Sequence, residues 1–285
     1  MRKFNISTRA ARRMLGMEEK KPAEQKPEET QAPEKEAEEA APERWLRVTS
    51  RTDVGLVRKD NQDAIILGPG LMGVADGMGG HKGGEIASAG ARDGLVRHLE
   101  GKAPDRKTLE EAVKEVNEEL WIRQEQDEQL SGMGTTLSVL WAMEDRMIIA
   151  HVGDSRIYLL REGIIRQVTK DHSMVADMVR KGLLTEEQAA VHPMRNYITR
   201  AVGTEPTIQV DMLSMERQAG DRWLICSDGL HGLLEREKIR TLMGEEDLEE
   251  AADQMMREAL DRGGRDNISL VLISDEPLRK GEVAE

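Results

Sequence analysis

The chain has very few aromatic residues and only one cysteine. Phe, Trp and Tyr together make up 2% of its 285 residues. A buried core must therefore be built mainly from Leu, Ile, Val, Met and Ala. The single cysteine, Cys226, excludes a disulfide within one chain and fits a reducing compartment.

Long hydrophobic runs and an excess of positive charge are missing as well. No apolar stretch approaches the roughly 20 residues that cross a bilayer, and the N-terminal MRKFNISTRAARRML lacks the apolar centre of a secretory signal. The formal net charge of −13 argues against general nucleic-acid binding. We therefore expect a cytoplasmic protein with no transmembrane segment and no nucleic-acid partner.

The N-terminal region lacks large apolar residues. Residues 16–43 are mostly Glu, Lys, Pro, Ala and Gln, too polar to offset the entropy of ordering, so we expect a disordered charged tail over 1–44. The basic stretch 2–15 fits a docking peptide, a weak membrane-surface helix or simply a frayed terminus. The folded domain is expected at 45–275, followed by a short tail at 276–285.

Strand and helix signals mix after residue 45. Apolar or alternating runs predict strands at 45–50, 63–68, 71–75, 134–143, 146–152, 155–161, 164–168, 207–213, 222–227 and 268–274. Helical periodicity predicts helices at 84–99, 107–129, 173–190 and 246–262. Because a short Gly-Asp turn separates 146–152 from 155–161, we expect a β-hairpin there. Strand runs broken by long helical pairs favour an α+β fold with antiparallel sheets over a parallel wound sheet.

Aspartates lie at the ends of four separate apolar runs: Asp76 in GVADGMGG, Asp154 in HVGDSR, Asp228 in ICSDGL and Asp266 in GRDNISL. Each alone is typical of a turn or a helix cap. Four similar junctions suggest that one end of a sheet gathers carboxylates, whose mutual repulsion a cation must offset. Asp76 and the carbonyl of Gly77 offer the oxygen ligands that a hard divalent cation prefers.

Two further segments near these aspartates carry candidate ligand contacts. The glycines of GVADGMGGHKGGEIAS let the backbone approach a ligand closely, although a flexible loop would look the same; without GK[ST] the stretch is not a nucleotide-binding loop. Arg58, in GLVRKDNQDAI, can hold two phosphate oxygens with its planar guanidinium. A surface arginine before a strand is the alternative interpretation.

Eight motifs occur in order between Trp45 and Asp275: TDVGLVRKDNQD, VADGMGGHKGGEIAS, GMGTTL, AHVGDSRIYLL, TKDHS, ITRAVG, CSDGL and RDNISL. Together they resemble the metal-dependent serine/threonine protein phosphatase family, type 2C, in its short bacterial form. The resemblance implies a four-layer αββα sandwich of two antiparallel sheets flanked by helices. It also implies hydrolysis of phosphoserine and phosphothreonine on proteins, which would oppose bacterial serine/threonine kinases.

The resemblance implies a binuclear centre of Mn2+ or Mg2+. Asp76 would bridge the two ions, the Gly77 carbonyl would bind one of them, and Asp228 and Asp266 would bind the other. A water activated by the ions would attack phosphorus, so no protein nucleophile is needed. Cys226, in an apolar run without a CxxxxxR arrangement, is interpreted as core.

The resemblance assigns roles to other motif residues too. Asp63 would act through a water, and Asp154 with Asp228 matches a third metal site of bacterial members. Arg58 would hold the phosphate of the substrate. The segment from His172 to about Tyr197 would form a flap beside the site.

The proton donor stays open. Many eukaryotic members carry a histidine directly after Asp-Gly, where this chain has Met78. His81, three residues on, or a metal-bound water could donate the proton. We interpret His151 as structural and His172 as a residue that caps or positions the flap.

Two other functional classes compete with an active phosphatase. An inactive regulator would lack a metal aspartate, whereas all four strand-end aspartates are present. A metal-binding interaction module whose tail does the work is the other alternative. The expected partners are phosphorylated proteins and a cognate serine/threonine kinase, and a monomer is expected.

Overall fold

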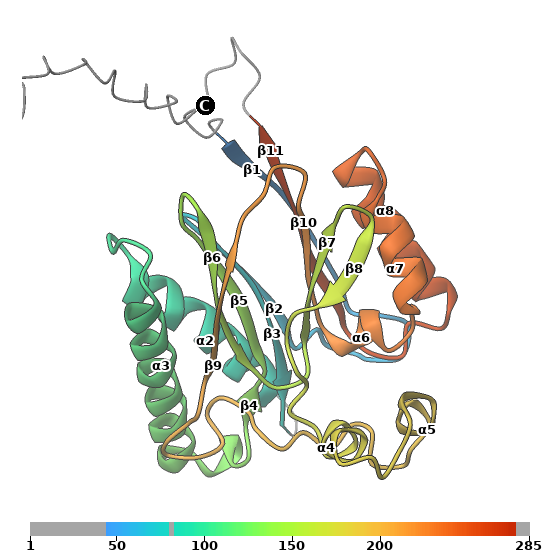
Figure 1. Ribbon diagram of the computed structural model, residues 1–285. Coiled ribbons are helices and arrows are strands. Elements are labelled where there is room, and N and C mark those ends of the chain that lie inside the picture. Colours follow the sequence, from blue (N-terminus) through green and yellow to red (C-terminus); the bar gives the residue numbers. More distant parts are fainter. Residues whose placement is uncertain (1–43, 80–82, 278–285) are drawn as a thin grey trace, which may run out of the picture. The chain divides into compact units, whose positions relative to one another are not determined.

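Two antiparallel sheets pack face to face in the computed structural model, which describes residues 44–79 and 83–277 (Figure 1). The first sheet has the order β1 (Arg44–Asp53), β11 (Ile268–Pro277), β10 (Arg222–Cys226), β7 (Arg156–Arg161) and β8 (Ile164–Gln167). The second has the order β2 (Asp63–Gly68), β3 (Leu71–Met78), β5 (Leu137–Ala142), β6 (Arg146–Val152) and β9 (Asp211–Glu216), with β4 (Gly134–Thr135) beside β3.

Helices cover the outer faces of both sheets, which confirms the predicted αββα sandwich (Figure 1). The second sheet is covered by α2 (Gly83–Leu99) and α3 (Arg106–Gln126), which continues into the short η1 (Glu128–Leu130). The first sheet is covered by α6 (Asp228–His231), α7 (Arg236–Met243) and α8 (Leu248–Asp261). The segment predicted to form the flap contains α4 (Met174–Arg180) and α5 (Glu186–Ala190). Among the described residues no helix has the length and apolarity that a membrane crossing requires.

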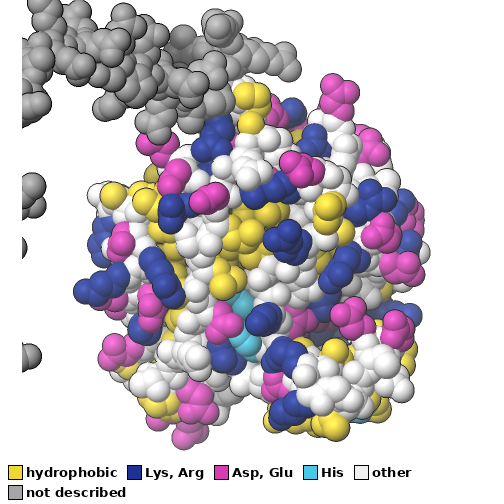
Figure 2. Space-filling model, in the orientation of Figure 1, with side chains coloured by type: hydrophobic (Ala, Val, Ile, Leu, Met, Phe, Trp, Pro, Cys, Tyr) yellow, Lys and Arg dark blue, Asp and Glu magenta, His cyan; other side chains and the backbone are white. Residues whose placement is uncertain are grey.

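Alternation along the strands divides the core into three apolar layers. On β11, Leu270 and Leu272 pack under the helices of the first sheet, whereas Val271 and Ile273 face the second sheet. Trp223 of β10 joins the layer between the sheets and is fully buried. Figure 2 shows hydrophobic side chains gathered in the middle of one face, between surrounding side chains of both charges.

The predicted hairpin of β6 and β7 is wrong. β6 lies between β5 and β9 in the second sheet, and β7 lies between β10 and β8 in the first. Each strand thus has neighbours on both sides, and neither has a free edge for the other. Gly153 and Asp154 instead carry the chain from one sheet to the other, which places Asp154 at the junction of the two sheets.

Three smaller predictions also need correction, and two helices were missed. The helix predicted at 173–190 is two helices, because Gly182 takes a left-handed φ of 70° and Thr185 starts α5 with a capping box. The strand predicted at 207–213 is β9, at 211–216. The strand predicted at 134–143 is interrupted between β4 and β5. Finally, α6 and α7 were not predicted, because both are short.

Candidate active site

Five aspartates meet at one end of the sandwich. Asp63 begins β2 and is the direct strand partner of Asp76 on β3. Asp228 follows β10, Asp266 precedes β11, and Asp154 lies in the crossover between the sheets. The charges of the other four all act on Asp76. The structure therefore brings together the aspartates that the sequence singled out.

Two threonines fix the backbone of Asp76. The hydroxyl of Thr136 accepts from the Asp76 N–H at 2.9 Å, and the Thr136 N–H donates to the Asp76 carbonyl at 2.8 Å. The Thr135 hydroxyl donates to the same carbonyl at 2.9 Å. Sequence reasoning left both threonines out of the site, although their position after a glycine in GMGTTL was the available signal.

Close backbone packing places the other aspartates. A Cβ on Gly77 would lie 2.0 Å from the Gly84 carbonyl oxygen, so only glycine allows α2 to start this close to β3. A Cβ on Gly229 would likewise lie 2.0 Å from the carbonyl oxygen of Asn267. This second contact brings the start of α6, with Asp228, against the loop that carries Asp266.

A serine holds Asp63 in the same cluster. The Ser227 hydroxyl donates to Asp63 Oδ2 at 2.8 Å and accepts from the Ser269 N–H at 3.0 Å. Ser227 thereby links β10 and β11 to the start of β2. The only signal for this role in the sequence is the position of Ser227 directly before Asp228.

Arg58 reaches the cluster through the loop between β1 and β2. Its Nη2 donates to Asp266 Oδ2 at 2.7 Å, and about half of its side chain stays exposed. The amide of Asn267 pins this loop by donating to the carbonyls of Val54 at 2.9 Å and Asp60 at 3.0 Å. The guanidinium thus lies at the mouth of the site with further N–H groups that can bind an anion.

Asp154 is buried, with 6% of its surface exposed, and its Oδ1 has no hydrogen-bond partner within residues 44–79 and 83–277. Its backbone carbonyl accepts from His231 Nε2 at 3.0 Å. The preceding Gly153 donates its N–H to His172 Nδ1 at 3.0 Å. Sequence reasoning missed His231, which lies on the unpredicted helix α6.

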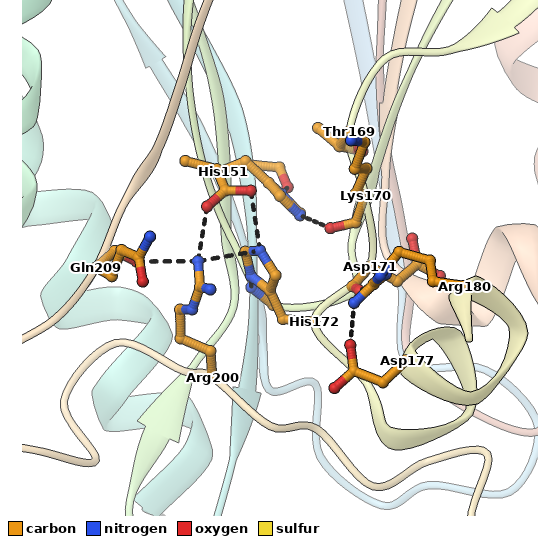
Figure 3. Close-up of polar contacts among 12 residues, drawn as sticks. His151, Thr169, Lys170, Asp171, His172, Asp177, Arg180, Arg200 and Gln209 are labelled. Atoms are coloured by element: carbon orange, nitrogen blue, oxygen red, sulfur yellow. Dashed lines mark hydrogen bonds and ion pairs between the residues drawn. The ribbon is translucent and has the colours of Figure 1, made fainter.

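His172 also ties the flap to the edge of the second sheet (Figure 3). Its Nε2 faces Asp211 Oδ2 at 3.2 Å, and Arg200 Nη1 donates to Asp211 Oδ1 at 2.7 Å. His151 donates from Nε2 to the Lys170 carbonyl at 3.1 Å. Both histidines therefore have the positioning and structural roles expected from the sequence.

Burial and mutual repulsion raise the pKa values of the aspartates. Burial, and then the charges of the neighbouring aspartates, holds the pKa of Asp76 well above its usual range. Burial raises the pKa of Asp63 to about 6. Burial and the charge of Asp266 raise the pKa of Asp228 to about 6, and burial and the charge of Asp228 raise the pKa of Asp154 to about 8. A cation would offset this cost.

The cluster suits a hydrated hard cation. Within the described residues, no three His, Cys, Asp or Glu side chains form a complete ligand group by themselves. Mg2+ keeps several waters and is bound through one or two carboxylates, so such a group is not required. The partnerless Oδ1 of Asp154 supplies a buried ligand atom that a cation would satisfy.

Two other predicted residues have clear outcomes. His81 lies outside the described residues, so its role stays a prediction. Cys226 is fully buried, and burial raises the pKa of its thiol to about 12, so it belongs to the core as predicted.

Comparison with known proteins assigns this arrangement to a family. The family model described as protein phosphatase 2C matches residues 48–272. The serine/threonine protein phosphatase PstP of Mycobacterium tuberculosis is 39% identical over 230 residues, which cover 80% of this chain and 44% of that relative. The chain thus spans less than half of PstP. The serine/threonine phosphatase stp of Listeria monocytogenes is 37% identical over 257 residues, which cover 82% of this chain and 98% of that relative.

Solved structures agree. A crystal structure of the M. tuberculosis phosphatase PstP/Ppp has a TM-score of 0.77 and 38% identity, covering 81% of this chain and 99% of that one. The PstP catalytic domain in complex with two manganese ions has a TM-score of 0.75 and 36% identity, covering 81% of this chain and 98% of that one. The chain therefore belongs to the protein phosphatase 2C family of metal-dependent serine/threonine protein phosphatases.

Proposed function

We propose that this protein hydrolyses phosphoserine and phosphothreonine on other proteins at a centre of Mn2+ or Mg2+ ions. The observation that carries the proposal is the aspartate cluster with an arginine at its mouth. Carboxylates this close and this buried are costly without a cation. Arg58 adds an anion-binding group beside them. A site that only bound cations would need no anion-binding group.

The cluster offers ligands for two ions and a third. Asp76, the Gly77 carbonyl, Asp228 and Asp266 would hold the two ions, and Asp154 with Asp228 the third. Asp63, already bound by Ser227, would orient water next to Asp76. When bound, such ions lower the pKa of water and offset charge on phosphoryl oxygens.

Arg58 would bind the phosphoryl group of the substrate, and Cys226 is unsuited to act as a nucleophile on it. Arg58 would contact the phosphoryl oxygens with N–H groups not used on Asp266, and so orient the ester for attack. Cys226 is a poor nucleophile, because its raised thiol pKa leaves almost no thiolate near neutral pH. His81 remains a candidate for donating a proton to the departing serine or threonine oxygen.

The proposal also covers the partners, the cellular location and the oligomeric state of the protein. A cognate serine/threonine kinase would supply the phosphorylated substrates, and the protein would work in the cytoplasm as a monomer. These statements rest on the family and on the single buried cysteine rather than on the site.

The proposal is tested with a purified protein, p-nitrophenyl phosphate and a phosphothreonine peptide. We expect Mn2+-dependent release of phosphate from both, abolished by excess EDTA and by Asp228→Ala. Full activity in EDTA would refute a metal-dependent mechanism. An intact, Mn2+-binding protein without activity on either compound would favour a regulator or an interaction module.

A further inference from the structure

A cavity of about 380 Å³ lies beside the aspartate cluster, within the size range of small-ligand sites. Its apolar lining comes from Met78, Ile198, Ala201 and Ile208. The rest of the lining is polar and consists of Thr199, Arg200, Thr204, Thr207, Gln209 and the exposed Glu205. None of these residues belongs to the metal or phosphate machinery described above.

The cavity shares a strand with the candidate metal ligands. Asp76 and Met78 are two residues apart on β3, so their side chains lie on the same face, about 7 Å apart along the strand. Both are partly exposed, whereas Ala75 and Gly77 on the opposite face are buried. The face that presents Asp76 therefore continues directly to Met78.

The far wall of the cavity is attached to the same strand. Met78 pairs with Gly134 of β4, and Thr135 forms a bridge with Val202. A Cβ on Gly134 would lie 2.5 Å from Thr204 Cγ2, so residues 201–204 run directly along β4. This contact keeps the wall at a fixed place relative to Asp76.

Of the two charged residues on the cavity wall, Glu205 is exposed and Arg200 is held by an ion pair. The Nη1 of Arg200 donates to Asp211 Oδ1 at 2.7 Å and to the Gln209 carbonyl at 3.2 Å (Figure 3). Ile208 packs against the core of the second sheet. The four apolar residues of the wall thus favour an apolar side chain, and Glu205 and the nearby aspartates disfavour an acidic one.

We propose that this cavity binds an apolar side chain of the phosphoprotein substrate, one or two residues from the phosphorylated residue. The inference rests on the proposed phosphatase function and specifies its substrate class. In an extended peptide, side chains two residues apart are separated by about 7 Å. A substrate whose phosphoryl group lies at the cluster can therefore place a neighbouring side chain in the cavity.

The test compares phosphothreonine peptides that differ only by Leu or Asn at one position. These side chains are similar in size and both are uncharged, so the ratio of their kcat/KM values reports apolar binding alone. Each of the two positions on either side of the phosphothreonine is varied in turn. We expect a ratio of about five to ten in favour of Leu at one or more positions, as partial burial of a leucine predicts.

Two variants identify the cavity as the source of that ratio. Ile208→Asn and Met78→Gln make its wall polar, and each should bring the ratio close to one. Ile164→Asn on β8, where the isoleucine is 67% exposed and outside the cavity, is the matched control and should keep the ratio. If Ile208→Asn fails to fold, Met78→Gln, which keeps the side-chain size, decides the test.

The outcomes separate the two proposals. A wild-type ratio near one at every position, or a ratio that persists in both variants, would overturn the apolar subsite while p-nitrophenyl phosphate is still hydrolysed. Loss of the ratio in the variants but not in the control supports it. Failure of the wild type to hydrolyse any phosphate ester in Mn2+ would overturn the phosphatase proposal and the subsite with it.

Discussion

Asp228→Asn should stabilise the metal-free protein while abolishing its activity. Asp228 lies among the other aspartates, and its pKa is raised from 3.8 to about 6 by burial and the charge of Asp266. That shift corresponds to a cost of about 3 kcal/mol for the charged form, at about 1.4 kcal/mol per pKa unit. The amide removes the charge but is itself desolvated, so we expect a gain of about 1–2 kcal/mol at pH 8.

Urea unfolding at pH 8 in EDTA, and again in Mn2+, measures both halves of this prediction. Without metal, the variant should unfold at a higher urea concentration than the wild type. Mn2+ at 100 times its Kd should stabilise the wild type by about 2.7 kcal/mol and the variant by much less. Phosphatase activity of the variant should fall by about 100-fold or more. Asp261→Asn, at an exposed aspartate of α8, is the matched control and should change none of these values.

A destabilised metal-free Asp228→Asn protein would refute this reasoning. Asp228 begins α6, and an aspartate that merely favoured the start of that helix would cost stability when neutralised. The sign of the change therefore distinguishes a repulsive cation site from an ordinary helix terminus.

Three further predictions follow from the same geometry. Arg58→Ala should lower kcat/KM for a phosphopeptide by about 100-fold, and Arg58→Lys should recover little of this loss. Mn2+ binding measured by calorimetry should not weaken, because at the aspartates Arg58→Ala removes only the ion pair with Asp266. Unchanged kinetics would contradict the phosphate role of Arg58. Gly77→Ala should lower the free energy of unfolding in urea by about 3 kcal/mol or more, because the alanine Cβ would overlap the carbonyl oxygen of Gly84. A variant as stable as the wild type would contradict the close packing of β3 against the start of α2. Because the folded pKa of Asp154, about 8, exceeds its unfolded value, the stability it contributes is full at low pH and is lost as pH rises to about 8. The Tm difference between Mn2+-loaded and metal-free protein should therefore grow from pH 5 to pH 8, and a constant difference would argue against cation binding at these aspartates.

The aspartates of the site were predictable because each follows or precedes an apolar strand. Such junctions collect at the ends of a sheet, so acids at several of them imply proximity. Asp63 and Asp76 illustrate this, since antiparallel pairing of β2 and β3 makes them direct partners. Most strands were predictable for the same reason: their residues alternate or form apolar runs.

The path of the chain between β6 and β7 was not predictable from local pattern. A short Gly-Asp connection suits a hairpin and a crossover equally, and the choice depends on which strand edges are already occupied. The supporting residues Thr136, Ser227 and His231 were missed for a related reason. Each acts through a hydrogen bond to a residue distant in sequence or on a short, unpredicted helix.

The most direct test of the account is anomalous diffraction at the manganese edge from crystals grown with Mn2+. We predict two strong peaks among Asp76, the Gly77 carbonyl, Asp228 and Asp266, and a third between Asp154 and Asp228. Protein from the same preparation should release phosphate from a phosphothreonine peptide. Active protein whose crystals hold no manganese at these aspartates would contradict the account.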